Sequence, residues 1–435
     1  MLWLCVRLPP LEPAVLTRLA VWAQQWSSHV SCGGSPDDAL LWLEIGASLR
    51  IFGGHAALRD TIATALEPFG YRTTLAIAPT PQAARLFTRV ATSRRAGHAI
   101  ADLAMLRRRL APLRLELLAL PAPALCALRS AGLRRIGEVL ELPAAALARR
   151  FGPATSGYLR RLCGAAPDPL PAVPFPDHYA GRVEFDGELT DSVALLFPLQ
   201  RLLWELQGYL RAADRALQTY ALRLEHHRRA DTELIMRCQV PSRDAAQLLT
   251  LVRERLGGLA LPAPVRALQL IAREFTAPAV AQADFFARDS EYAAALHQTL
   301  DRVRARLGAQ AVEQLHPASD YRPERAWRGD SAATAETNVM TRFESLHEIR
   351  LVKTGHDVGP DIAELSPRPC WLLREPRVLS APPALINGPE RIESGWWDQH
   401  DIARDYYLAR AGDGARQWVF QDLRSGVWYL HGLWA

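Results

Sequence analysis

The spacing of apolar residues predicts alternating strands and helices over the first hundred residues. Period-two and helical patterns predict strands at 2–8, 39–46 and 71–78, and helices at 13–30, 55–66 and 80–92. Glycine, serine, proline and aspartate dominate residues 31–38, a composition that is typical of a turn. We therefore expect residues 1–100 to form one layered domain of mixed helix and strand.

The middle of the chain divides into a helical part and a mixed part. Residues 101–165 have helical spacing interrupted by prolines, and the proline-rich residues 166–176 mark a boundary. Residues 176–275 then follow the order β-α-β-β-α-β, which predicts a small α+β domain. Its strands are expected at Gly181–Leu189, Ala216–His226, Thr232–Gln239 and Ala267–Phe275, and its helices at Val193–Ala213 and Asp244–Leu256.

The rest of the chain combines a linker with a strand-rich end. Residues 276–345 are expected to be a linker, polar at first, helical over 291–307 and loop-like beyond. Residues 346–435 are expected to form a small β-rich domain. There, alternating segments on either side of Asp413 and Gly414 predict a hairpin, and Val427–His431 predicts a third antiparallel strand.

Composition narrows the class of protein. Apolar residues make up 49% and charged residues 22% of the chain, as in folded soluble proteins. No apolar run reaches 18 residues, and the start of the chain lacks the pattern of a secretory signal, so we expect neither a membrane span nor export. The six cysteines form no CxxC pair, so we expect no zinc site, no redox site, no cofactor, and a cytoplasmic protein.

Positive charge is concentrated in one segment. The formal net charge is only +5, but residues 94–162 hold 13 arginines and 4 acidic residues, a local excess of nine positive charges. Such a local excess favours contact with a polyanion such as DNA. The alternative is a solvated, arginine-rich helical face with no ligand.

The same segment carries the pattern of a helix-hairpin-helix. One helix is expected to end near Ser130, Gly132 and Gly137 lie in the hairpin, and a second helix starts at Gly137. Glycines let the backbone approach a phosphate, and a helix N-terminus offers amides and a positive dipole end. Arg134 and Arg135 add charge there, so these four residues are candidate DNA contacts. The alternative is a helical hairpin in which the glycines serve only as cap and turn.

The order of these parts resembles Y-family translesion DNA polymerases, and several motifs resemble the ImuB-type proteins of bacterial mutagenesis cassettes. The resemblance covers essentially the whole chain. Its motifs are the segments 43–54 (LEIGASLRIFGG), 75–81 (LAIAPTP), 322–327 (RPERAW), 388–397 (GPERIESGWW), 404–407 (RDYY) and 430–434 (LHGLW).

The resemblance implies a fold and a set of partners. The fold would be a shortened palm over residues 1–100, a helix-hairpin-helix thumb over 101–165, a β-α-β-β-α-β little finger over 176–275, and the β-rich C-terminal domain. The implied partners are a RecA-like ImuA-type protein and an error-prone paralogue of the DNA polymerase III α subunit. The fingers are expected to be missing, because the first strand runs almost directly into a helix.

The carboxylates that nucleotidyl transfer requires are not where the family places them. Two Mg²⁺ ions need acidic ligands from the first strand and from an Asp-Glu pair on a later strand. Residues 1–11 contain no acid, and Ala39 and Leu40 align with the Asp-Glu pair. Asp37 and Asp38 could be displaced ligands, but a Ser-Pro-Asp-Asp turn is the favoured interpretation. No metal site and no polymerase activity are therefore expected.

A short peptide after the little finger is typical of motifs that bind the bacterial β sliding clamp. Gln282-Ala-Asp284-Phe285-Phe286 matches the form Q-x-x-L/F-F/L, with the two rings as apolar anchors. The alternative is that both rings pack back on the little finger. A second match at residues 247–251 lies in an expected amphipathic helix, where the leucines would be core.

Eight aromatic residues crowd the C-terminal region, and we expect at least half of them to be core and the others to be available to partners. They are Trp396, Trp397, Tyr406, Tyr407, Trp418, Phe420, Trp428 and Tyr429. The favoured function is a non-catalytic adaptor that binds DNA and the clamp and recruits a polymerase for translesion synthesis. The alternatives are an active translesion polymerase and a degenerate remnant.

Overall fold

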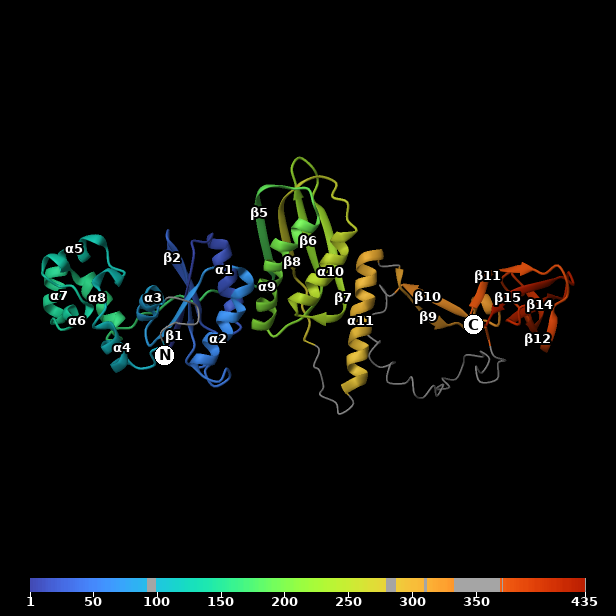
Figure 1. The fold of residues 1–435 in the computed structure, drawn as a ribbon, viewed down its shortest axis with the longest axis horizontal. Coiled ribbons are helices and arrows are strands. Elements are labelled where there is room, and N and C mark those ends of the chain that lie inside the picture. Colours follow the sequence, from blue (N-terminus) through green and yellow to red (C-terminus); the bar gives the residue numbers. More distant parts are fainter. Residues whose placement is uncertain (92–98, 279–286, 309–310, 332–367, 370, 435) are drawn as a thin grey trace. The chain divides into compact units, whose positions relative to one another are not determined.

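The computed structural model describes residues 1–91, 99–278, 287–308, 311–331, 368–369 and 371–434 (Figure 1). The chain separates into two compact units, Met1–Arg306 and Leu307–Ala435, and each is described by itself. Among the helices of the described residues, none is long and apolar enough to cross a membrane.

The first unit begins with a four-stranded antiparallel sheet, here called the N-terminal sheet. Its strands lie in the order β2-β3-β1-β4. They are β1 (Trp3–Leu8), β2 (Val30–Ser35), β3 (Asp38–Glu44) and β4 (Thr74–Ala78). Helices α1 (Pro13–Ala23) and α2 (His55–Ala65) pack on the face that carries Leu4 and Leu41, and α3 (Pro81–Val90) packs on the face that carries Cys5 and Leu40.

Two sequence expectations were wrong in this region. Helix α1 ends at Ala23 rather than near residue 30, and Val30–Ser35 is a strand rather than part of a turn. Residue 34 must be small because β2 runs close to β3: a Cβ at Gly34 would lie 2.2 Å from the carbonyl oxygen of Asp38. The glycines that suggested a turn therefore permit a tight hairpin whose loop is only residues 36–37.

Five short helices follow as a helical segment. They are α4 (Leu103–Leu110), α5 (Ala122–Ser130), α6 (Ile136–Leu140), α7 (Ala144–Phe151) and α8 (Pro153–Leu162). Leu106, Leu128, Ile136 and Leu159 belong to the same apolar cluster as Cys5 of the N-terminal sheet. The helical segment is thereby joined to the sheet by a continuous core.

The next part confirms the β-α-β-β-α-β prediction. Its elements are β5 (Tyr179–Leu189), α9 (Leu196–Ala212), β6 (Leu217–His226), β7 (Thr232–Ser242), α10 (Ala245–Gly257) and β8 (Val265–Ala272). The strands form the central sheet, in the order β5-β8-β6-β7. Leucines of α9 and α10 form the core with one face of this sheet. A last helix, α11 (Ala287–Leu307), is anchored to strand β7, where the carboxylate of Asp301 accepts the backbone N–H of Gln239.

The second unit is rich in strands. Strands β9 (Glu313–Pro317) and β10 (Trp327–Ser331) pair with each other, so the expected loop after residue 308 contains a two-stranded sheet. A five-stranded sheet follows in the order β11-β15-β14-β13-β12. Its strands are β11 (Trp371–Val378), β12 (Ala384–Ser394), β13 (Ile402–Arg410), β14 (Arg416–Asp422) and β15 (Trp428–Leu433). The predicted hairpin and third strand are confirmed, and so is the α+β class with a β-rich end.

Candidate nucleic-acid interface

The positions that the resemblance aligns with catalytic carboxylates, Ala39 and Leu40, lie near the start of β3, an inner strand of the N-terminal sheet. The register of β1 against β3 places Arg7 opposite Leu40 and Leu8 opposite Ala39. Ala39 and Leu40 are both buried, and each belongs to an apolar cluster. Among the described residues, no group of three or more His, Cys, Asp or Glu side chains could hold a metal ion.

Asp38 is at the start of β3 and is engaged in an ion pair. Its Oδ2 lies 3.1 Å from Nε of Arg7, and its Oδ1 accepts a 2.7 Å hydrogen bond from Ser35. Burial disfavours the charged carboxylate, but the Ser35 hydroxyl and the charges of Arg7 and Arg85 outweigh it, so the pKa of Asp38 lies below its usual value. The other acid in this strand, Glu44, accepts the backbone N–H groups of Leu2 and Gly46 and is therefore structural.

The helix-hairpin-helix is present, but its two glycines, Gly132 and Gly137, have different structural roles. Gly132 has φ +86° and ends α5 with open space around it, as a glycine C-cap does. Gly137 lies inside α6 against the end of α4: a Cβ there would come within 3.0 Å of the Ala111 backbone. Gly137 is thus required for helix packing, and the expectation that it faces a phosphate is not supported by its position.

The amides at the start of α6 are occupied, which corrects the expectation that they are free. The N–H groups of Arg134 and Arg135 donate to the carboxylate of Glu138. The N–H groups of Ile136 and Gly137 donate to the carbonyls of Leu113 and Ala111. Any contact that this hairpin makes with DNA must therefore come from side chains.

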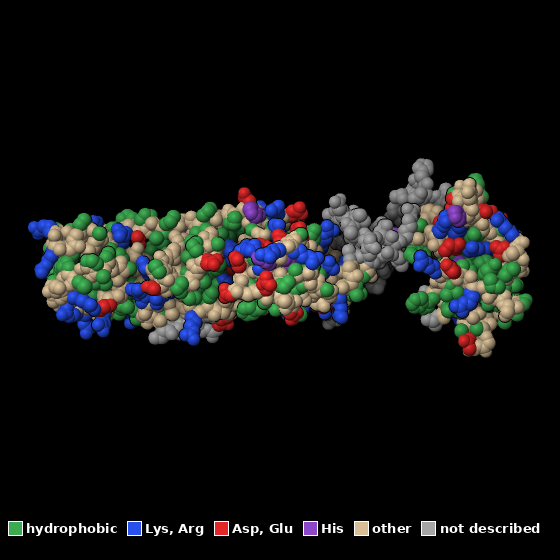
Figure 2. Space-filling view, turned by 90° about the horizontal axis from the view of Figure 1, so that it is seen from above, with side chains coloured by type: hydrophobic (Ala, Val, Ile, Leu, Met, Phe, Trp, Pro, Cys, Tyr) green, Lys and Arg blue, Asp and Glu red, His purple; other side chains and the backbone are tan. Residues whose placement is uncertain are grey.

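Arginine side chains cover the outside of the helical segment. Arg134 and Arg135 are exposed, and each donates to a nearby backbone carbonyl, of Arg129 and Pro112 respectively. Further exposed arginines lie on α4, α5, α7 and α8 and in the connection after α4: Arg107, Arg108, Arg109, Arg114, Arg129, Arg149, Arg150 and Arg160. Figure 2 shows blue side chains around this end of the first unit. The arrangement can neutralise several phosphates of a nucleic acid.

The clamp-binding peptide Gln282, Asp284, Phe285 and Phe286 lies outside the described residues, so it stays a prediction. Its flanks are anchored on the central sheet domain, which consists of strands β5 to β8 with helices α9 and α10. Before it, Thr276 and Ala216 exchange two backbone hydrogen bonds of 2.9 Å, and after it α11 is held by Asp301. The second match, at residues 247–251, lies in α10, where Leu248 and Leu251 are buried core residues.

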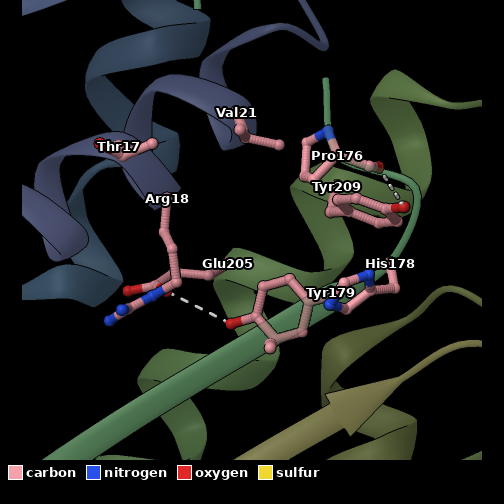
Figure 3. A pocket seen from close by; sticks show the side chains of 9 residues that line it. Thr17, Arg18, Val21, Pro176, His178, Tyr179, Glu205 and Tyr209 are labelled. Atoms are coloured by element: carbon pink, nitrogen blue, oxygen red, sulfur yellow. Dashed lines mark hydrogen bonds and ion pairs between the residues drawn. The ribbon is translucent and has the colours of Figure 1, made fainter. Parts of the chain in front are cut away.

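A small cavity of about 200 Å³ lies where α1 meets α9 and β5. In Figure 3, Arg18 of α1 points at Glu205 of α9, and Tyr179 approaches the same carboxylate. The Arg18–Glu205 ion pair measures 2.6 Å, and the glutamate side chain is fully buried. This pair and Trp22, packed against Gly208, join the N-terminal sheet domain to the central sheet domain.

Of the eight C-terminal aromatics, three are buried, namely Tyr406, Trp418 and Phe420. Three more, Tyr407, Trp428 and Tyr429, are partly buried and pack against the apolar clusters, so more than half belong to the core as expected. Trp396 and Trp397 are 82% and 56% exposed. His431 is also core, since its Nδ1 lies 2.8 Å from the hydroxyl of Tyr406. Burial lowers the pKa of His431 to about 4, although the charge of Glu324 acts in the opposite direction.

Two residues were missed by sequence reasoning, namely Arg7 and Arg85. The sequence alone showed that residues 1–11 contain no acid. It did not show that Arg7, in the same apolar strand, lies opposite Leu40. A lone charge in Trp-Leu-Cys-Val-Arg-Leu was the available signal. The register of β1 and β3 was needed to place it at the expected metal site.

Comparison with known proteins gives relatives in sequence and in structure. No family model matches the chain. Among solved structures, DinB from Sulfolobus solfataricus is 15% identical, with a TM-score of 0.31 over 59% of this chain and 75% of that one. A DinB family error-prone DNA polymerase from the same organism is 12% identical, with a TM-score of 0.33 over 62% of this chain and 98% of that one.

The sequence relatives cover nearly the full length. Protein ImuB from Caulobacter vibrioides, strain NA1000 / CB15N, is 29% identical over 452 residues, which span 98% of this chain and 94% of the relative. Protein ImuB from strain ATCC 19089 / CIP 103742 / CB 15 gives the same values. The motifs at Leu43–Gly54, Gly388–Trp397 and Leu430–Trp434 pointed to the same group. The chain is thus similar over nearly its full length to proteins of the ImuB type.

Proposed function

We propose that this protein is a non-catalytic, polymerase-like adaptor of translesion synthesis and damage-induced mutagenesis in the cytoplasm. It binds DNA and the β sliding clamp, and it recruits a separate error-prone polymerase. One observation carries the non-catalytic part: Arg7 lies opposite Leu40 in the sheet. A guanidinium and an isobutyl group occupy the place where carboxylates would be needed to hold Mg²⁺.

An active polymerase with displaced acids is the second candidate. Asp37 and Asp38 are the acids nearest to the expected site. Asp38 is committed to Arg7 and Ser35, and Asp37 is exposed in the two-residue loop between β2 and β3. A metal ion at Asp38 would have to displace the arginine, which is always charged. The geometry therefore favours the adaptor.

DNA binding is assigned mainly to the helical segment. Its exposed arginines give a sequence-independent contact with phosphates, which suits a protein that must act wherever synthesis stalls. Arg134 and Arg135 are included through their side chains, and Gly132 and Gly137 shape the hairpin that carries them.

Clamp binding is assigned to Gln282, Asp284, Phe285 and Phe286. The anchored flanks support this role, because a peptide tethered at both ends to one domain is presented with little loss of chain entropy. The resemblance supplies the remaining partners, the RecA-like ImuA-type protein and the polymerase III α-subunit paralogue. The exposed Trp396 and Trp397 are candidate contacts for one of them.

A pull-down with purified β clamp tests the adaptor role. Replacing Phe285 and Phe286 by alanine should reduce clamp retention at least tenfold, because the apolar anchors of such a peptide provide most of its binding free energy. The matched control is Phe197→Ala, since Phe197 is 86% exposed on α9 in the same domain. Equal retention of the double variant and the wild type would contradict the assignment of the peptide.

A further inference from the structure

The face of the N-terminal sheet that carries Arg7 has a charge pattern suited to an anion. We propose that Arg7 and Arg85 form a metal-free site for phosphate oxygens at the place where carboxylates would hold Mg²⁺. The proposal rests on the proposed function, because it assigns to the inactive centre a part in holding DNA.

Arg7 is oriented for such a contact. It is the only charged residue of β1, and its side chain is 35% exposed although its strand neighbours are buried. Asp38 accepts a hydrogen bond from Nε, and the described residues provide no acceptor for the two terminal nitrogens. A guanidinium held at Nε presents its terminal nitrogens as a fork, the geometry that suits a phosphate.

Arg85 supplies a second positive charge on the same face. It lies on α3, which packs on the face of the sheet that carries Cys5. Its charge helps to lower the pKa of Asp38 and opposes the effect of burial on the pKa of Cys5. In the described part of the chain, no hydrogen bond or ion pair occupies its guanidinium.

The charges at this place add up to an excess of one. Arg7 and Arg85 contribute two positive charges and Asp38 one negative charge, while burial keeps the Cys5 thiol neutral. A site with this balance repels divalent cations and attracts phosphate, which is the reverse of what a two-metal centre requires. Phosphate could then be held without a metal.

The test is binding of a fluorescent primer–template to the full chain, followed by anisotropy in EDTA. Arg7→Gln with Arg85→Gln should weaken binding about tenfold at low salt and reduce the salt slope of log K by about two. The charge-matched control is Arg211→Gln with Arg253→Gln, since both residues are exposed on α9 and α10, the helices that pack on the central sheet. An equal loss in both double variants would overturn the site.

A second variant gives a change of opposite sign. Asp38→Asn removes the negative charge and frees Arg7, so it should strengthen binding severalfold in EDTA. Thermal unfolding of the variant confirms that it is folded. Unchanged or weaker binding by a folded Asp38→Asn protein would overturn the proposal, and so would DNA binding of the Arg7/Arg85 variant equal to that of the control.

The source of the phosphate is settled by competition. A nucleoside triphosphate, added without metal, should displace the labelled DNA only if the site takes free nucleotides. If the triphosphate does not displace DNA from the wild-type chain, and the Arg7/Arg85 variant has lost DNA affinity, then the phosphate that the site binds belongs to the DNA backbone. Failure of the wild-type chain to bind DNA at all would instead contradict the proposed function, so the two failures can be told apart.

Discussion

At the scale of single residues, the proposal of an inactive centre rests on three positions. The resemblance aligns Ala39 and Leu40 with an acidic pair, both residues are buried, and Arg7 lies opposite Leu40 in the sheet. The sequence alone predicted that acids are lacking at these positions. It was not sufficient to see Arg7 as their counterpart, because a cross-strand pair depends on a register that no local pattern encodes.

His431 is the residue whose titration should affect stability. Its pKa of about 4 in the folded chain lies below the ordinary value of 6.5, so the unfolded chain binds more protons between these values. Neutral His431 therefore contributes its full share to the free energy of unfolding above pH 6.5. This contribution is lost as the pH falls toward 4, at roughly 1 kcal/mol per pH unit.

The measurement is chemical denaturation of the wild-type chain across this pH window, followed by its total tryptophan fluorescence. Trp418 contributes to this signal, and its ring stacks on the His431 ring at 5.7 Å. His431→Gln should flatten the pH dependence. A variant with the same slope as the wild type would show that another group is responsible.

At the scale of elements, periodicity predicted most helices and strands, and it failed where two signals conflicted. The central sheet domain was predicted nearly element by element, because its strands alternate and its helices carry long leucine patterns. Strand β2 was missed because Gly33 and Gly34 resemble a turn, although Gly34 is needed where the two strands approach closely. The seam between α1 and α9 had no sequence signal, since Arg18 and Glu205 are 187 residues apart.

That seam should depend on its buried ion pair. Arg18→Met leaves the buried carboxylate of Glu205 with only Arg201 as a cationic neighbour, at 3.7 Å. Breaking a buried ion pair in this way typically lowers the free energy of unfolding by about 3–5 kcal/mol. Arg18→Met with Glu205→Leu should recover much of that loss, because no unpaired charge remains. Urea denaturation measures both variants.

The control for the buried Arg18–Glu205 pair is the exposed ion pair Arg243–Asp214, whose side chains are 42% and 82% exposed. Arg243→Met should change the free energy of unfolding by less than about 1 kcal/mol. If Arg18→Met were equally mild, the pair would not stabilise the junction between the two sheet domains.

At the scale of the whole molecule, the proposed adaptor combines an inactive centre with surfaces for other molecules. The helical segment exposes at least ten arginines, and the peptide proposed to bind the clamp comes between Thr276 and α11, which are both anchored on the central sheet domain. The second unit has its own aromatic core and exposes at least four tryptophans, Trp327, Trp371, Trp396 and Trp397. Such a distribution suits a protein that assembles a complex on DNA while another protein performs the synthesis.

The most direct test of this conclusion is primer extension by the purified full chain with Mg²⁺ and all four deoxynucleotides. The same preparation should bind the primer–template in the anisotropy assay, so that inactivity cannot be ascribed to misfolded protein. We predict DNA binding with no extension above the protein-free control. The non-catalytic assignment would be contradicted if the wild-type chain extended the primer and Asp38→Ala abolished that extension.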